Sequence, residues 1–345
     1  RRVGVMGAED LAYLPAVEQL ARFRAGELSP VEVLDAQIER AAAFEPVVNA
    51  FSEQLFEQAR SQAEQAERRY REGRPRRLEG LTLAVKETMA VRGTVTTHGS
   101  LVHRDDPPAQ RSHPYVERLQ RAGAIVHART TSPEFACAWI TTSRLNGTTR
   151  SPWDRELTCG ASSGGSGASL AVGSATLATG TDIGGSIRYP AAACGVVGYM
   201  PPHGRNPEVS PDNLDPYEHV GPLARTVADC ALMQNITAGP HPEDSATLRQ
   251  RIRLPLDPPG IEGWRVAWTD DVGNGVVDPA VAAGLRTALD QLEAAGASVE
   301  RVDLGWGAEV TEAARAYLDH LFGRGFARTC EQHPDLVCDY TAWYG

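Results

Sequence analysis

Apolar residues recur every three to four positions through residues 14–72, and this period predicts helices. One helix is expected to stop at Gly26, and the next to restart with Ser29 as its N-cap and Pro30 in its first position. The stretch 52–73 is strongly charged with alanine spacers, which predicts a helix with a solvated face. The chain is therefore expected to begin with a helical segment.

Residues 81–88, LTLAVKET, alternate instead, and this pattern predicts a strand. Leu81, Leu83 and Val85 fall on one side, while Lys86 falls on the other side at the end of the strand. A helical pattern over 113–123 and a buried type of strand over 124–130 follow. Strands and helices that alternate in this way are typical of the α/β class.

The later part of the chain repeats this alternation. Residues 201–226 are rich in Pro, Asn and Asp and predict a long connection, and 221–239 predict a helix that ends at Gly239. Residues 265–304 predict a strand, a helix and a strand, and 308–330 predict a further helix. The prediction is thus an α/β fold in which long loops border a site.

Two clusters of glycine and serine, at 160–165 and 180–188, bracket a run from Ala168 to Thr179 that predicts about three helical turns. Gly184 and Gly185 precede Ser186, and glycines let successive N–H groups point at one place, as an oxyanion requires. A flexible linker is disfavoured because helix-forming and apolar residues surround the clusters. Neither a phosphate-binding GxxxxGK[ST] loop nor a GxSxG elbow is present.

Four segments together closely resemble the amidase signature family: LAVKET (83–88), GTTRSPWD (147–154), GASSGGSGAS (160–169) and GTDIGGSIRYPAAACGVVG (180–198). Their order, and the 24 positions between Ser162 and Ser186, are far more specific than any one segment. The resemblance implies a mixed central β-sheet flanked by helices. It also implies a helical segment at 1–75 packed on an α/β domain at 76–345. Family members usually continue past Gly345, so this domain is expected to lack its C-terminal part.

The resemblance also assigns roles. Ser186 matches the nucleophile, Ser162 matches the bridging serine that follows a cis peptide bond, and Lys86 matches the base. A strand lysine taken alone is usually exposed, so only the downstream serine segments make Lys86 a catalytic candidate. The backbone amides that match the oxyanion hole are those of Ile183, Gly184, Gly185 and Ser186.

The segment PEFACAW (133–139) lies where the family places residues near the acyl pocket. Substrate contacts are therefore expected from Glu134, Phe135, Trp139, Gly160 and Ala161, although core packing explains the aromatic residues equally well. The two aromatic side chains weakly indicate an apolar or aromatic acyl group.

This sequence departs from the usual family pattern in three places. Ala161 replaces the commoner glycine, Glu87 the commoner aspartate, and Met200 the usual lysine. None of the three belongs to the triad, but Met200 is expected to change the surroundings of the site.

Composition and charge narrow the function further. The formal net charge of −10 argues against a general nucleic-acid binder. The sequence contains no apolar run of 18 residues, so no membrane-spanning helix is predicted. Six scattered cysteines without metal-like spacing predict free thiols and a cytoplasmic protein, with Cys159 as a packing residue. His98, His103, His113 and His127 also lack metal-ligand spacing. We therefore expect no metal and no cofactor. The expected partner is a small amide; the oligomeric state stays open, with a homodimer among the options.

The leading hypothesis is an amidase that forms an acyl-enzyme through a Ser-Ser-Lys triad. It requires a neutral lysine, whose pKa must fall from about 10.4 by roughly three units, at a cost of about 4 kcal/mol. Burial among glycines and serines, without a carboxylate partner, would supply this shift. The alternatives are the glutaminase subunit of a glutamine-dependent amidotransferase and a catalytically silent binding protein; the intact triad argues against the last.

Overall fold

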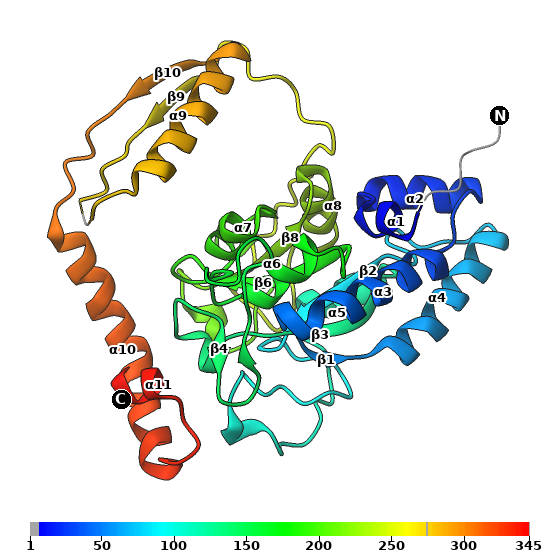
Figure 1. Ribbon diagram of the computed structural model, residues 1–345, viewed down its shortest axis with the longest axis horizontal. Coiled ribbons are helices and arrows are strands. Elements are labelled where there is room, and N and C mark those ends of the chain that lie inside the picture. The colour runs from blue at the N-terminus through cyan, green and yellow to red at the C-terminus, as the bar shows by residue number, and fades with distance from the viewer. Residues whose placement is uncertain (1–6, 274, 345) are drawn as a thin grey trace. The chain divides into compact units, whose positions relative to one another are not determined.

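The computed structural model describes residues 7–273 and 275–344, which fall into two compact units (Figure 1). The first unit runs to Leu256 and includes His333–Thr341. The second contains Asp257–Gln332 and the residues that follow Thr341. All the candidate site residues lie in the first unit, which is therefore described in more detail.

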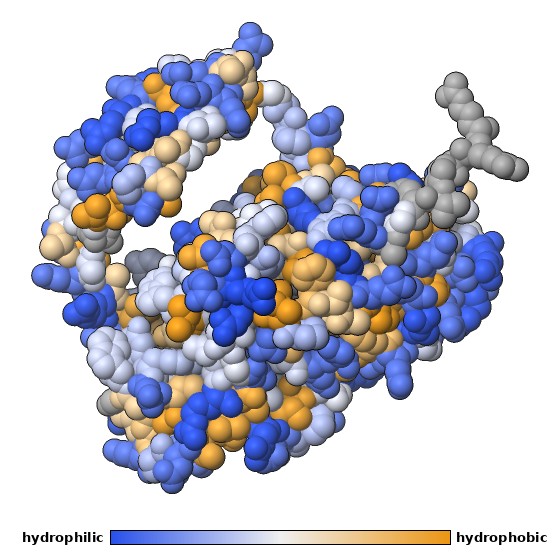
Figure 2. Space-filling view, viewed as in Figure 1, coloured by the Kyte–Doolittle hydropathy of each residue, from blue (hydrophilic) through white to orange (hydrophobic). Residues whose placement is uncertain are grey.

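The first unit begins with four helices, α1 (Ala8–Tyr13), α2 (Ala16–Ala25), α3 (Pro30–Val48) and α4 (Phe56–Arg71). The predicted helix ends are confirmed. Gly26 ends α2 with a left-handed backbone (φ 69°), and the backbone N–H of Val31 donates to the hydroxyl of Ser29 at 3.1 Å, which makes Ser29 the N-cap of α3. Helix α4 buries its alanines, and Figure 2 shows hydrophilic residues over its outer side. The prediction of a solvated helix is confirmed.

The prediction of continuous helix over 14–72 is wrong at one place. Residues Phe51–Gln54 form strand β1, which pairs antiparallel with β3 (Ile125–Thr130), Phe51 opposite Thr130. Phe51 is buried, whereas Glu53 and Gln54 are exposed. The pairing partner lies almost 80 residues away in the sequence, so local periodicity does not reveal it.

The central sheet has six strands in the order β1-β3-β2-β6-β8-β7. Strand β2 (Thr82–Lys86) runs parallel to both β3 and β6 (Leu177–Asp182). Strand β8 (His219–Ala224) runs antiparallel to β6 and to β7 (Val197–Gly198). The predicted mixed α/β fold is therefore confirmed.

The two faces of the sheet carry side chains of different size. Leu83, Val85 and Leu177 face one side, where α2, α5 (Pro114–Arg121) and α8 (Val227–Thr237) cover them. Ala84 and Ala178 face the other side, toward α6 (Gly164–Ala171) and α7 (Arg188–Cys194). Because these inward residues are small, the backbone of α6 approaches the sheet closely.

The predicted helix over 168–179 is only partly correct. Helix α6 starts earlier, at Gly164, and ends at Ala171. The chain then turns at Gly173 (φ 76°) and enters strand β6. Residues 177–179 are strand because β6 lies between β2 and β8 and pairs with both, which outweighs the helix propensity of its Leu and Ala.

The predicted connection over 201–226 also contains structure. It holds the short helix η3 (Asp212–Leu214) and the whole of β8, so the predicted helix over 221–239 begins only at Val227. Pro222 lies within β8 opposite Thr179. Proline cannot donate a ladder hydrogen bond and usually argues against a strand, which explains why the sequence pattern concealed β8.

Shorter elements complete the first unit: η1 (Leu101–His103), η2 (Glu134–Ala136), β4 (Thr142–Ser143) and β5 (Gly147–Thr148). The second unit has the predicted strand, helix and strand, with β9 (Arg265–Trp268) parallel to β10 (Ser298–Arg301) and α9 (Pro279–Ala294) between them in sequence. It continues with α10 (Ala308–Gln332), and α11 (Asp339–Tyr344) contains residues of both units.

Within 7–273 and 275–344, no helix has the length and hydrophobicity that crossing a bilayer requires. All six cysteines are free thiols, as predicted.

Candidate active site

Lys86 ends strand β2 and is fully buried, in contrast to an ordinary strand lysine. Its backbone N–H donates to Thr179 Oγ1 at 3.0 Å. Its Nζ donates to Ser162 Oγ at 2.7 Å and to Thr181 Oγ1 at 2.8 Å. The neighbouring strand β6 thus holds the lysine at both ends and directs its amine at Ser162.

Burial lowers the pKa of Lys86 to about 8, and the carboxylates of Glu218, Asp182 and Glu87 oppose this shift. The predicted direction and cause are confirmed, and no carboxylate is bonded to Nζ within the described ranges. The chain also contains one lysine and 33 arginines among its 34 basic residues. Arginine cannot lose its proton in a protein, and the only lysine of the chain stands at the position that the family resemblance assigns to the base. The single lysine is therefore a signal in the sequence that is independent of the motifs.

Ser162 lies in the turn that leads into α6 and is 1% exposed. The peptide bond between Ala161 and Ser162 is cis, as the family resemblance implied. The next backbone N–H, that of Ser163, donates to the carbonyl oxygen of Ser186 at 3.2 Å. This bond brings the two glycine-rich loops together, while no hydrogen bond joins the two serine hydroxyls in the part of the chain that the structure describes.

Ser186 lies in the loop between β6 and α7, and a single carboxylate shapes this loop. Asp182 is fully buried and accepts from the backbone N–H groups of Gly185, Ile187 and Arg188 at 2.8, 3.0 and 3.2 Å. The Arg188 side chain donates to both carboxylate oxygens, at 3.0 and 2.8 Å. Burial alone would raise the pKa of Asp182, but these bonds outweigh it and hold the pKa below its usual value.

The four amides that match an oxyanion hole are not equivalent. The N–H of Gly185 already donates to Asp182. Those of Ile183, Gly184 and Ser186 make no hydrogen bond within residues 7–273 and 275–344. Three neighbouring donors in the loop of Ser186 are therefore available to a developing negative charge.

Trp139 is the most exposed of the predicted substrate contacts. Its side chain is 59% exposed, and its Cη2 atom lies 3.9 Å from the point where a Cβ atom on Gly184 would sit. The indole is therefore beside the loop of Ser186. Phe135 is partly exposed and has a left-handed backbone (φ 52°).

The other predicted contacts are buried. Both carboxylate oxygens of Glu134 are occupied, by Ser100 Oγ at 2.8 Å and by Cys338 N and Thr341 Oγ1 at 2.7 and 2.5 Å. The backbone of Gly160 packs on Pro190, and Ala161 is 2% exposed. Cys159 is fully buried, and burial raises the pKa of its thiol to about 12, which fits the predicted packing role.

Three residues that the motif analysis did not single out belong to the site. Thr181 and Asp182 lie within the motif GTDIGGSIR, so their proximity to Lys86 and Ser186 was open to inference. Glu218 precedes β8 in a loop without any recognisable signal. No group of three or more metal-ligating side chains is found among the described residues.

Comparison with known proteins agrees with this geometry. A sequence-family model described as "Amidase" matches residues 32–329. A glutamyl-tRNA(Gln) amidotransferase subunit from Pelobacter propionicus is 35% identical over 349 residues, 96% of this chain and 70% of that protein. An indoleacetamide hydrolase of Bradyrhizobium diazoefficiens is 36% identical over 298 residues, 84% of this chain and 56% of that protein.

Among solved structures, a bacterial aryl acylamidase of the amidase signature enzymes family has a similar fold. It matches with a TM-score of 0.87 and 27% identity, over 97% of this chain and 72% of that one. The chain thus has the fold and the signature segments of an amidase signature protein, and it belongs to the amidase family. It spans between 56% and 70% of the length of the two curated relatives.

Proposed function

We propose that the protein is an amide hydrolase that uses Ser186 as nucleophile, Ser162 as relay and Lys86 as base. The observation that carries the proposal is the 2.7 Å hydrogen bond between the amine of Lys86 and the hydroxyl of Ser162, both fully buried. A buried amine that is bonded only to hydroxyls can lose its proton near neutral pH, which an exposed lysine cannot.

The reaction would begin with neutral Lys86. The amine takes a proton from Ser162, which takes the proton of Ser186 as that oxygen attacks the amide carbon. The same protons return to the leaving nitrogen when the C–N bond breaks, and water then hydrolyses the acyl-enzyme. The backbone bond between Ser163 and Ser186 supports the relay because it holds the two serine loops side by side.

The unpaired N–H groups of Ile183, Gly184 and Ser186 would stabilise the oxyanion of the tetrahedral intermediate. One such donor contributes about 3 kcal/mol in other acyl-transfer enzymes. The exposed indole of Trp139 beside Gly184 supports contact with an apolar or aromatic part of the substrate. The substrate class we propose is therefore a small carboxylic amide with such a group.

A second candidate is the glutaminase subunit of an amidotransferase, which would release ammonia to a partner. The 35% identity with the Pelobacter propionicus amidotransferase protein, over 96% of this chain, favours it. The two candidates differ in their requirements: the hydrolase acts on simple amides by itself, whereas the glutaminase requires glutamine and a partner protein.

The proposal is tested with a panel of amides and glutamine, with products identified by mass spectrometry. A serine-directed fluorophosphonate should label the wild type but not Ser186→Ala, and Lys86→Ala should lose nearly all turnover. Ser169→Ala is a matched control, because that hydroxyl donates only to Ser166 O, at 2.9 Å, within α6. Wild-type turnover by Lys86→Ala with an unchanged pH profile would refute the assignment.

A further inference from the structure

The indole beside the loop of Ser186 belongs to a segment with little regular structure of its own. Residues 134–144, here named the Trp139 segment, contain one turn of 3-10 helix, η2, and the two-residue strand β4. Strand β4 pairs with β5, which is equally short. A hairpin of this size is not stable by itself, so other contacts must hold Trp139 near Gly184.

The backbone just before Trp139 also requires support from its surroundings. Phe135 and Ala136 both have left-handed backbones, with φ 52° and 57°. A Cβ atom makes this region unfavourable, and residues stay in it where neighbouring structure holds them there. The path by which the chain reaches Trp139 is therefore imposed by contacts with other parts of the protein.

A stretch far away in sequence supplies such a contact at Glu134. Residues 335–341, here named the return segment, follow most of the second unit in sequence but belong to the first. One carboxylate oxygen of Glu134 accepts from the backbone N–H of Cys338 at 2.7 Å and from Thr341 Oγ1 at 2.5 Å. Glu134 and Thr341 are both fully buried. The return segment is thus bonded to the first residue of the Trp139 segment.

Tyr340 joins the same two segments through its hydroxyl. The hydroxyl accepts from the backbone N–H of Glu134 and donates to the carbonyl oxygen of Thr142, both at 2.7 Å. A phenol hydroxyl has one hydrogen to donate, and here it also accepts one. Tyr340 therefore ties the start of the Trp139 segment to strand β4, which lies on the other side of the indole in sequence.

Arg144 binds the return segment at the far end of the Trp139 segment. Its Nη1 donates to the carbonyl oxygens of Asp335 and Val337, at 2.6 and 3.1 Å. Its backbone N–H donates to Cys338 Sγ at 3.4 Å. The return segment thus holds residues on both sides of Trp139.

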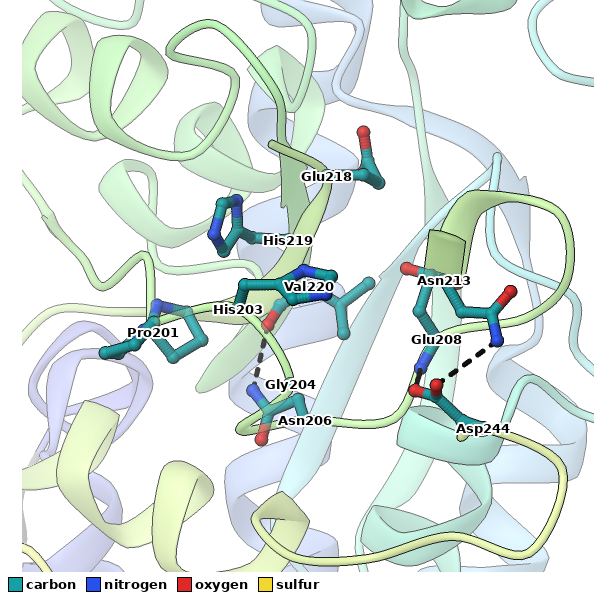
Figure 3. Close-up of a pocket in the computed structure, with 11 residues that line it drawn as sticks. Pro201, His203, Gly204, Asn206, Glu208, Asn213, Glu218, His219, Val220 and Asp244 are labelled. Atoms are coloured by element: carbon teal, nitrogen blue, oxygen red, sulfur yellow. Dashed lines mark hydrogen bonds between the residues drawn. The ribbon is translucent and has the colours of Figure 1, made fainter. Parts of the chain in front are cut away.

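The end of strand β6, where the loop of the nucleophile starts, borders a pocket of a different kind (Figure 3). His219 belongs to its lining, and its Nδ1 lies 3.2 Å from the carbonyl oxygen of Asp182. Asn213 and Asp244 in the same lining are bonded to each other at 3.2 Å. This side offers a substrate mainly polar groups, whereas the exposed indole of Trp139 offers an apolar surface.

We propose, building on the amide-hydrolase function above, that Glu134 and the return segment position Trp139 and so determine how tightly amides with an aromatic or apolar acyl group are bound. Glu134 is a positioning residue, because both its carboxylate oxygens already accept hydrogen bonds within the protein and its effect passes through Trp139. This role differs from the substrate contact that the sequence predicts for Glu134.

Tyr340→Phe is the mildest test, since it takes one hydroxyl away from the backbone groups of Glu134 and Thr142. With phenylacetamide as substrate, KM should rise about three- to tenfold, the range of an aromatic contact, while kcat and its pH dependence stay unchanged. With acetamide, which has no ring, KM should not change. Tyr70→Phe is the matched control, because that hydroxyl, in α4, donates to the backbone carbonyl of Glu79 at 2.9 Å.

Substitutions of Glu134 test the carboxylate itself. Glu134→Leu leaves the donors of Cys338 and Thr341 unpaired and should raise the KM for phenylacetamide at least as much as Tyr340→Phe does. Glu134→Gln keeps an oxygen that accepts from both donors, and its NH2 group can donate to the hydroxyl oxygen of Ser100. It should therefore restore most of the affinity that Glu134→Leu loses. If Glu134→Leu does not fold, Tyr340→Phe decides.

A double-variant cycle shows whether the effect passes through Trp139. In a Trp139→Ala background, Tyr340→Phe should raise the KM for phenylacetamide no further, because the side chain that was positioned is gone. An equal increase in both backgrounds would overturn the inference, and so would equal increases for phenylacetamide and acetamide.

Fluorine NMR separates this inference from the proposed function. In protein labelled with fluorotryptophan, the six tryptophans give six signals, and the one that Trp139→Ala removes belongs to Trp139. That signal should shift in Tyr340→Phe and stay in place in Tyr70→Phe. If it shifts but no amide is hydrolysed, the hydrolase proposal fails while the positioning of Trp139 stands. A signal that does not shift refutes the positioning, whatever the activity.

Discussion

Replacing Lys86 by methionine should make the protein more stable at pH 7 while it abolishes activity. The pKa of the buried amine falls from 10.5 to about 8 on folding. At about 1.4 kcal/mol per unit, holding the ammonium in the fold at pH 7 costs roughly 3 kcal/mol. Methionine keeps the length of the side chain without the charge, so this cost disappears.

Two hydrogen bonds act against the gain. The hydroxyls of Ser162 and Thr181 each lose the Lys86 amine as a partner, at a cost of about 1 kcal/mol apiece. The net effect at pH 7 is thus a stabilisation of about 1 kcal/mol. Between pH 8 and 10.5 the unfolded chain binds more protons at this lysine than the folded one, so wild-type stability rises with pH through that window. At pH 10.5 the variant should be the less stable protein.

The test is urea unfolding of wild type and Lys86→Met at intervals from pH 7 to 10.5. The difference in unfolding free energy should change by about 3 kcal/mol across this range and reverse its sign. Leu83→Met, a buried apolar change on the same strand, is the control and should give a difference that does not depend on pH. A pH-independent difference for Lys86→Met would show that folding leaves the pKa of the lysine unchanged, and the reasoning would fail.

Three further changes test the site. Ser162→Ala should retain more turnover than Lys86→Ala, because water can take the place of the relay hydroxyl, and the double variant should cost little more than Lys86→Ala alone; steady-state kinetics decide this. Asp182→Asn removes a buried carboxylate that accepts five hydrogen bonds and should destabilise the fold by about 3–5 kcal/mol and lower kcat; a melting temperature and kcat near those of the wild type would contradict this. Gly165→Ala places a Cβ 2.4 Å from the hydroxyl oxygen of Thr131 and should destabilise the fold by about 1–3 kcal/mol, which urea unfolding measures.

The sequence was sufficient wherever structure depends on a few neighbouring residues. The cap at Ser29, the stop at Gly26 and the alternation that ends at Lys86 all appear as predicted, because caps, turns and pleats are local interactions. Short segments were also enough to predict the candidate base, Lys86, and the candidate nucleophile, Ser186. The glycines next to Ser186 form the turn that exposes its hydroxyl, so both the turn and the serine are visible in one local motif.

Only the tertiary structure decided which strands complete the sheet and what surrounds the lysine. Strand β8, which contains Pro222, exists because it pairs with β6 along six residues, and no local preference indicates this. The hydrogen bond from Lys86 Nζ to Thr181 joins positions 95 residues apart, and the carboxylates that oppose the lowered pKa of Lys86 include Glu218 from the loop before β8. Whether a buried lysine is charged depends on burial and on distant carboxylates, so its protonation is a property of the folded sheet that the motif alone does not contain.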